Sequence, residues 1–172
     1  MSRSECHPDM EKLRDLISKV TDEQKLTILL QTKSERHSTA LHEAAYRGDA
    51  EMITTILSSI QTADRLKSLM MRDFIKRTPL HAVAWRGHTE SVKAILNSLT
   101  ADQQMQLLAE QEWYGKTAVE MASGETADVL IRYSMNAIRE TRKGKSMICH
   151  PLILCLCVGI GKHSQKTCKV PC

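Results

Sequence analysis

The chain has 172 residues, of which 42% are hydrophobic and 26% charged, and this composition fits one soluble globular domain with a tail. Its formal charge of +4 is uneven, because residues 139–172 carry seven Lys or Arg against one Glu and the preceding residues sum to −2. Five of the six cysteines lie in the last 24 residues, so the body is nearly free of cysteine and a disulfide-built secreted scaffold is excluded.

The N-terminal segment, residues 1–36, predicts a helical partial repeat that caps the domain. Its opening, MSRSECHPDMEKLRDL, is polar and lacks the apolar core of a secretory signal. EKLRDLISKV (11–20) aligns with ESVKAILNSL (90–99), and VTDEQKLTILLQT (20–32) aligns with LTADQQMQLLAEQ (99–111) at a spacing of 79. We therefore expect an array that begins near residue 9, in an intracellular protein of the cytoplasm or, as the alternative, the nucleus.

A motif then recurs along the chain at a fixed interval. TALHEAAYRGDAE begins at Thr39, TPLHAVAWRGHTE at Thr78, and the decayed form TAVEMASGETADVL at Thr117. The three threonines are spaced by 39 residues. Self-similarity at such a period predicts a stack of supersecondary units, none of which buries its own apolar face.

Each unit has the sequence signals of a helix pair. Thr78 and Pro79 suit the cap and first position of a helix, and Gly87 suits the left-handed residue that ends it. The second helix then carries apolar residues at helical spacing, which predict the shared core: Val92, Ile95, Leu96 and Leu99 in one unit, and Met52, Ile53, Ile56, Leu57 and Ile60 in the other.

The segment after each helix pair is also repeated. LTADQQMQLLAEQ (99–111) matches IQTADRLKSLMMR (60–72), and Thr100 and Gln103 have the spacing of a capping box. We expect one or two added helical turns here, with apolar members packed under the second helices. Those members are Leu26, Leu29, Leu30, Leu66, Leu69, Met70, Met105, Leu107 and Leu108.

The pattern T-P-L-H-x-A-x-x-x-G-H, matched nearly in full from Thr78 to His88, resembles the ankyrin repeat. The resemblance implies an all-α, ankyrin-type helical repeat solenoid over residues 37–138, with about three repeats of which the last is degenerate, and extra short helices between repeats. Its period of 39 exceeds the usual 33 or so, and Glu120 stands where the family has His. The implied structural residues are Thr39, Leu41, His42, Gly48, Thr78, Pro79, Leu80, His81, Gly87 and Thr117. His42 and His81 are expected to bond to backbone near the connections.

In ankyrin-type arrays a partner contacts the hairpin tip before each Thr and the two residues before each Gly. Five of the six aromatic residues of this chain fall in those slots. The resulting candidate partner-binding residues are Tyr46, Arg47, Phe74, Ile75, Arg77, Trp85, Arg86, Trp113, Tyr114 and Lys116. Aromatic residues and arginine dominate protein interfaces, so we predict one shared concave face. The alternative is that Trp85 or Phe74 is buried between repeats.

The hairpins depart from the family at one position. The third unit has Gly115 before its last loop residue, whereas Lys76 and His37 occupy the equivalent position in the others. A non-glycine residue there costs about 1 kcal/mol if it is left-handed. Reshaped or mobile hairpins are therefore expected.

These features predict a non-enzymatic adaptor or scaffold, monomeric, that binds a protein or peptide segment carrying apolar and acidic groups. No Gly-rich phosphate loop, metal-spaced His/Glu set or nucleophile elbow is present in the sequence, so no enzyme activity, cofactor or metal is expected. The array is slightly acidic, so no nucleic acid is expected as partner.

The tail, residues 139–172, is basic and then cysteine-rich, and we expect it to be disordered. Its cationic cluster of Arg139, Arg142, Lys143 and Lys145 is open to a nuclear-import or anionic-surface role. The apolar run 147–160 is too short for a membrane span. Cysteine spacing argues against zinc, and the alternative to a soluble adaptor is a membrane-associated tether acylated on tail cysteines: Cys149, Cys155 or Cys157.

Overall fold

The computed structural model of the chain describes Asp15, Lys19 and residues 37–142. The predicted partial repeat at residues 1–36 lies almost wholly outside the described residues, and so do the tail cysteines and the apolar run 147–160.

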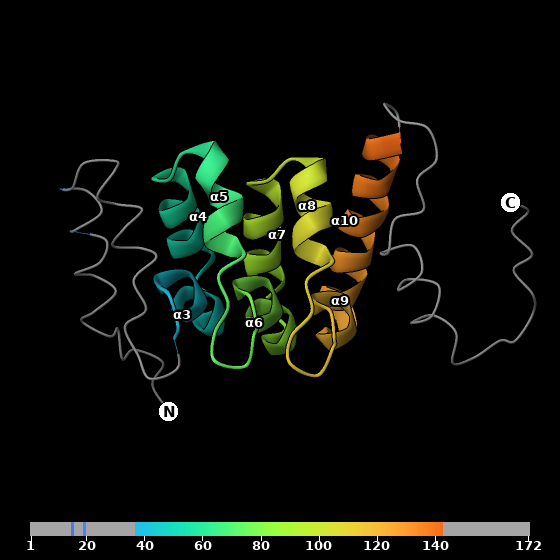
Figure 1. Cartoon of the computed structure of the whole chain (residues 1–172), viewed down its shortest axis with the longest axis horizontal. Coiled ribbons are helices and arrows are strands. Elements are labelled where there is room, and N and C mark those ends of the chain that lie inside the picture. The colour runs from blue at the N-terminus through green and yellow to red at the C-terminus, as the bar shows by residue number, and fades with distance from the viewer. Residues whose placement is uncertain (1–14, 16–18, 20–36, 143–172) are drawn as a thin grey trace, which may run out of the picture.

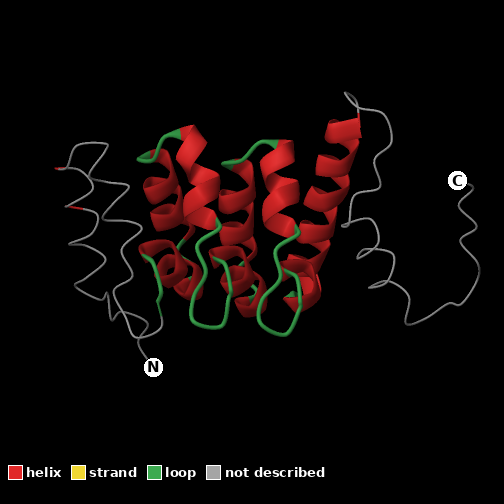
Figure 2. Cartoon of the chain, viewed as in Figure 1, coloured by secondary structure: helices red, strands yellow, loops and turns green. Residues whose placement is uncertain are grey.

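Residues 37–142 form a row of α-helices joined by loops, with no β-strand in that range (Figures 1 and 2). In chain order the helices are α3 (Ala40–Arg47), α4 (Ala50–Ser58), α5 (Thr62–Leu69), α6 (Pro79–Arg86), α7 (Thr89–Asn97), α8 (Ala101–Leu108), α9 (Ala118–Met121) and α10 (Gly124–Arg142). The predicted all-α repeat solenoid is therefore confirmed, and the added segments do form short helices, α5 and α8.

Each repeat opens with a short helix that starts where the motif predicts, and the first two of these helices also end there. Thr39, Thr78 and Thr117 are the N-caps of α3, α6 and α9, and Pro79 is the first residue of α6. Gly48 and Gly87, with φ of 74° and 75°, end α3 and α6 in the left-handed conformation. The chain can then turn at once into the second helix of the pair, because glycine adopts this conformation without a steric cost.

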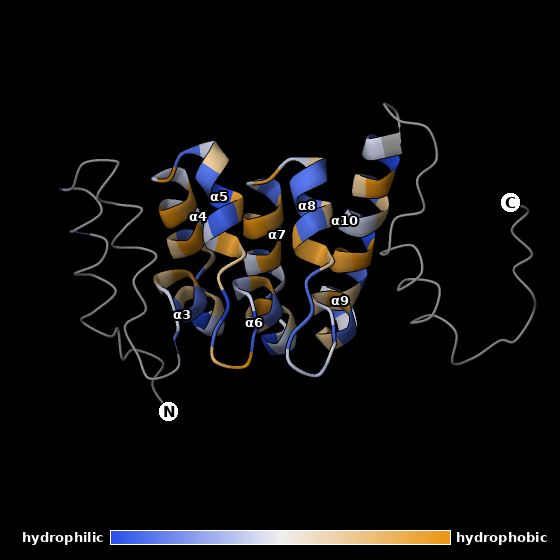
Figure 3. Ribbon diagram, in the orientation of Figure 1, coloured by the Kyte–Doolittle hydropathy of each residue, from blue (hydrophilic) through white to orange (hydrophobic). Residues whose placement is uncertain are grey.

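The core lies between two rows of helices. α3, α6 and α9 pack in one row, and α4, α7 and α10 pack in a second row, with each helix contacting its equivalent in the next repeat. Hydrophobic residues run along α4, α7 and α10 (Figure 3). Leu57, Ile95 and Leu96 are fully buried there, and burial of one such side chain contributes roughly 1.5–3 kcal/mol.

The added helices α5 and α8 form a third row and satisfy the ends of the second helices. Arg65 Nε on α5 donates to the carbonyl of Leu57 at 2.8 Å. Gln104 Nε2 on α8, which stands 39 residues later, donates to the carbonyl of Leu96 at 2.8 Å. Carbonyls at the end of a helix lack partners within it, so each added helix supplies the cap that the preceding helix needs.

The third repeat keeps the stacking and loses part of its first helix. α9 has four residues, because Ala122 is already extended with ψ of 156°. α10 follows with 19 residues and packs against α7, α8 and α9. The expected division after residue 138 falls inside α10, which continues to Arg142.

Candidate functional site

The loops before α6 and α9 are hairpin fingers with the same internal bonds. In the first, the amide of Lys76 donates to the carbonyl of Asp73 at 2.9 Å, and in the second the amide of Gly115 donates to the carbonyl of Glu112 at 3.0 Å. Lys76 is left-handed with φ of 59°, close to the 76° of Gly115. Lysine thus holds the geometry of glycine at a steric cost, and the expectation of a reshaped finger is wrong for this loop.

A buried acidic residue anchors each finger. Asp73 is 5% exposed, and its Oδ1 accepts the backbone amides of Ile75 at 3.0 Å and Arg77 at 2.8 Å. Glu112, at the equivalent position, accepts the amides of Tyr114 and Lys116. These carboxylates replace bonds that a short loop cannot make with its own backbone, and so they fix the fingers in place.

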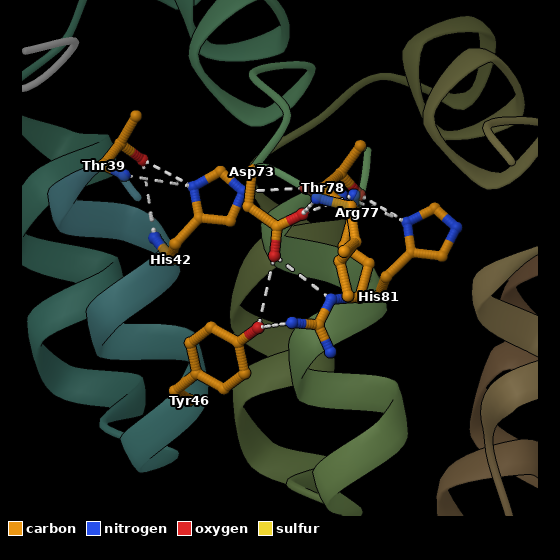
Figure 4. Close-up of polar contacts among 8 residues, drawn as sticks. Thr39, His42, Tyr46, Asp73, Arg77, Thr78 and His81 are labelled. Carbon is orange, nitrogen blue, oxygen red and sulfur yellow. Dashed lines mark hydrogen bonds and ion pairs between the residues drawn. The ribbon is translucent and has the colours of Figure 1, made fainter. Parts of the chain in front are cut away.

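Asp73 also ties its finger to the preceding repeat. Its Oδ2 accepts from the Tyr46 hydroxyl of α3 at 3.2 Å and from Arg77 Nε at 3.1 Å, while the Arg77 guanidinium contacts the same hydroxyl (Figure 4). The neighbouring finger is tied in turn, because the Trp113 amide donates to the carbonyl of Ile75 at 3.1 Å. The fingers and α3 therefore form one connected surface.

Histidines fix the bases of the fingers. His42 Nδ1 accepts the Thr39 amide, and its Nε2 lies 2.9 Å from the carbonyl of Arg77 in the next repeat. His81 repeats this arrangement with Thr78 and the carbonyl of Lys116. Since Nδ1 accepts an amide, Nε2 carries the proton and donates to the carbonyl. Burial lowers the pKa of both histidines, which keeps them neutral in these bonds.

Aromatic rings and cations alternate on the face formed by the fingers and first helices. The guanidinium carbon of Arg77 lies 5.2 Å from the ring centroid of Tyr46 and 5.8 Å from that of Trp85. The guanidinium carbon of Arg86 lies 4.9 Å from Trp85 and 5.9 Å from Tyr46. We call these four residues the aromatic–arginine stack. Each cation–π contact contributes about 0.5–1 kcal/mol when exposed.

Next to this stack, the finger tips expose large side chains. Phe74 is 49% exposed, Trp113 63% and Tyr114 80%, and Trp85 of the stack is 53% exposed. The Lys76 ammonium lies 5.4 Å from the ring centroid of Trp113. The alternative in which Trp85 or Phe74 is buried between repeats is therefore wrong.

The structure separates the predicted partner-binding residues into two groups. Tyr46, Trp85 and Arg86 adjoin one another in the stack. The finger residues are exposed, or in the case of Ile75 partly exposed: Phe74, Ile75, Trp113, Tyr114 and Lys116. By contrast, Arg47 is bonded to Glu43 one turn earlier on α3, at 2.7 Å. Arg77 is held by Asp73, with only 12% of its side chain exposed. These two arginines have partners within the chain.

Three residues of the site were missed by the sequence argument. Asp73 and Glu112 stand 39 residues apart and are both acidic, so their equivalence was a readable signal. His88 lies against Gly48 and its Nε2 lies 3.3 Å from the carbonyl of Tyr46. His88 has no such signal, because the equivalent residue in the first unit is Asp49.

The described residues contain neither a metal-binding cluster nor a membrane-spanning helix. In residues 37–142, together with Asp15 and Lys19, no cluster of His, Cys, Asp or Glu could hold a metal ion. Across the same part of the chain, no helix combines the length and apolarity that a bilayer crossing requires.

The stacked helix pairs, the fingers and the exposed aromatic face define an α-helical repeat solenoid. A model of ankyrin repeats, in three copies, matches residues 13–106, which is more than half of the chain. The chain belongs to the ankyrin repeat family. The match starts within the predicted N-terminal partial repeat and ends before the degenerate third motif.

A solved structure shares this fold. One chain of the crystal structure of the yeast ribosomal protein Rps3 in complex with its chaperone Yar1 superposes with a TM-score of 0.57 at 22% identity, covering 74% of this chain and 83% of that one. The ankyrin domain of Osh1 from Kluyveromyces lactis gives a TM-score of 0.39 at 15% identity, covering 83% of this chain and 60% of that one. No curated protein matches the sequence.

Proposed function

We propose that this chain is a non-enzymatic adaptor or scaffold that holds a segment of a partner protein against the face formed by the fingers and the first helices. One observation carries the proposal. Four of the five exposed large hydrophobic side chains in the described residues lie on this face, and two of them, Phe74 and Trp113, occupy equivalent positions of consecutive fingers: the four are Phe74, Trp85, Trp113 and Tyr114.

Exposing aromatic rings to water costs free energy, and contiguous exposed apolar patches on soluble proteins commonly mark interaction sites. The fingers hold them rigidly through Asp73, Glu112 and the bond from the Trp113 amide to the Ile75 carbonyl. A rigid aromatic surface loses little conformational entropy on binding, which favours affinity. One structure with this fold contains a ribosomal protein in complex with its chaperone, which supports a protein as the partner. We propose a monomer in the cytoplasm or nucleus.

The alternative function, a membrane tether acylated on Cys149, Cys155 or Cys157, depends on residues outside the described part of the chain. No observation on residues 37–142 favours it.

The test is affinity capture from cells with the full chain and with the Trp85→Ala/Trp113→Ala double variant. Met135→Ala is the matched control, because Met135 is also an exposed large hydrophobic residue, at 52%, but lies on α10. We expect the wild type and the control to capture the same proteins, and the double variant to lose them by about tenfold or more, as for central aromatic hot spots.

Thermal unfolding of the same variants completes the test. The exposed rings contribute little to the core, so the melting temperature of the double variant should stay within a few degrees of the wild type. Retained capture, or a collapse of the melting temperature, would contradict the proposal.

A further inference from the structure

The cations of this face differ in whether the chain already neutralises them. Arg47 is paired with Glu43 and Arg77 with Asp73. Within the described residues, Arg86, Lys76 and Lys116 form no ion pair. The face therefore presents three cations that have no ion-pair partner in residues 37–142, although the array as a whole is slightly acidic.

Three acidic side chains of the fingers and of the segment after α8 already have partners. Asp73 and Glu112 are buried and accept bonds within their own fingers. Glu110, at the end of α8, is paired with Arg72. These three carboxylates are therefore engaged elsewhere and form no ion pair with Arg86, Lys76 or Lys116.

Arg86 is oriented in advance for a carboxylate. Its guanidinium lies close to the rings of Trp85 and Tyr46, at 4.9 and 5.9 Å from their centroids. A guanidinium stacked on rings uses its faces and keeps the N–H groups of its edge for two parallel hydrogen bonds to one carboxylate. The residue is exposed, so that edge is open to a partner.

Lys76 has a backbone conformation that lysine does not favour. Its φ is 59°, and the same position of the next finger is Gly115. His37, at the equivalent position before α3, is left-handed as well, with φ of 52°. Strained residues of this kind cluster at binding sites. The Lys76 ammonium lies over the ring of Trp113 at 5.4 Å, next to the exposed apolar tips.

We propose that Arg86 and Lys76 select an acidic protein segment, one in which Asp or Glu residues alternate with apolar residues. One carboxylate binds the edge of Arg86, a second binds Lys76, and apolar side chains pack on Trp85 and Trp113. This inference rests on the proposed function and specifies the chemistry of its partner. Charge complementarity makes the face prefer an acidic segment to a neutral one, because the apolar rings alone would bind both equally well.

Tryptophan fluorescence reads out this surface directly, since Trp85 and Trp113 are the only tryptophans of the chain. The full chain is titrated with three synthetic peptides of equal length, in which Leu alternates with Glu, with Gln or with Lys. We expect the Leu/Glu peptide to shift the emission and to bind at least about tenfold more tightly than the Leu/Gln peptide, with a preference that weakens as salt rises. The Leu/Lys peptide should not bind.

The variants assign the selectivity to residues. Arg86→Gln and Lys76→Gln should each lower the affinity for the Leu/Glu peptide by about threefold to tenfold. Arg86→Lys should recover part of the loss at most, because lysine lacks the planar fork. Lys67→Gln, which removes an exposed lysine of α5 outside the face, is the control and should change nothing.

The Lys76→Gly substitution should change stability and affinity in opposite directions. Glycine relieves the left-handed strain, so the melting temperature should rise while the affinity for the Leu/Glu peptide falls. If Lys76 had only a structural role, its replacement would not lower the affinity for the peptide while raising the melting temperature.

Equal binding of the Leu/Glu and Leu/Gln peptides, or Arg86→Gln and Lys76→Gln behaving like Lys67→Gln, would overturn this inference. Tighter binding of an oligouridylate would also overturn it in favour of nucleic acid. The proposed function fails separately, if the Trp85→Ala/Trp113→Ala variant still captures the cellular partner.

Discussion

At the scale of single residues, two glycines with the same conformation have different surroundings. Gly48 and Gly87 are both left-handed, with φ of 74° and 75°. A Cβ built on Gly48 would lie 2.6 Å from the ring of His88, whereas a Cβ on Gly87 would meet only the Thr126 hydroxyl at 4.0 Å. Gly48 is therefore required both by its backbone conformation and by the contact between repeats.

This difference predicts unequal costs for the same substitution. Gly87→Ala should lower the free energy of unfolding by about 1 kcal/mol, the cost of a left-handed alanine. Gly48→Ala should lower it by about 2–4 kcal/mol, because the overpacking at His88 adds about 1–3 kcal/mol. Urea denaturation measures both, and Gly48→Ala/His88→Ala should recover part of the loss. Equal costs would show that the His88 ring moves aside freely.

Ser91 on α7 gives the opposite case, a buried group without a partner. It is fully buried, and its hydroxyl has no hydrogen bond within the described residues. The equivalent position of the first repeat is Met52, which is also buried. An unpartnered buried hydroxyl costs about 1–3 kcal/mol of desolvation, so the core tolerates rather than uses this serine.

We predict that Ser91→Ala raises the free energy of unfolding by about 0.5–1.5 kcal/mol, through lost desolvation cost and better helix propensity. Ser134→Ala is the control, because Ser134 is equally buried in a helix and its hydroxyl donates to the Leu130 carbonyl at 2.8 Å. Chemical denaturation of both should show a gain for Ser91 alone. A loss on Ser91→Ala would reveal a bond that this hydroxyl makes.

The roles of single residues could be predicted from the sequence only in part. Positions set by a repeated local rule were predictable, as with the caps and the helix-ending glycines. The role of Arg77 was not, because its availability depends on a buried carboxylate, Asp73, and a hydroxyl from another repeat, Tyr46. The position of a residue in the motif predicts whether it adjoins the face. It does not predict whether the side chain already has a partner within the chain.

At the scale of elements, α5 and α8 explain the long period of the repeat. Each adds a helix whose polar side chain, Arg65 or Gln104, caps the helix before it, and whose apolar residues Leu69 and Leu108 are fully buried. The capping box at Thr100 made the helix itself predictable from sequence. The capping of α7 by Gln104 was not predictable, because the side chain of Gln104 bonds to the backbone carbonyl of Leu96 across the turn between the two helices.

Replacing each of two glutamines of α8 by alanine tests whether α8 caps α7. Gln104 Nε2 donates to the carbonyls of Leu96 and Leu99, at 2.8 and 3.3 Å, whereas Gln106 is exposed. Gln104→Ala should lower the free energy of unfolding by about 1 kcal/mol, the net worth of such bonds. Gln106→Ala, with the same change in helix propensity, should be close to neutral in urea denaturation. Identical values for the two would mean that the cap contributes nothing.

At the scale of the whole molecule, the repeats are joined by bonds that recur with the period. His42 reaches the Arg77 carbonyl and His81 the Lys116 carbonyl, so each histidine connects one repeat to the finger of the next. In a linear array, stability is the sum of the repeats and of these nearest-neighbour interfaces. Weakening a single interface therefore weakens the entire stack.

The histidines make that coupling depend on pH. Burial lowers their pKa below the ordinary 6.5, so the folded state holds them neutral. Their contribution is complete above pH 6.5 and is lost as the pH falls from there through the folded pKa, because the unfolded chain takes up protons first. We expect the urea midpoint to fall between pH 7 and pH 5. His81→Gln should lower stability at pH 7 and flatten this dependence, since the amide keeps a donor but cannot titrate. A His81→Gln variant with the full slope of the wild type would show that the acid sensitivity of the array arises elsewhere.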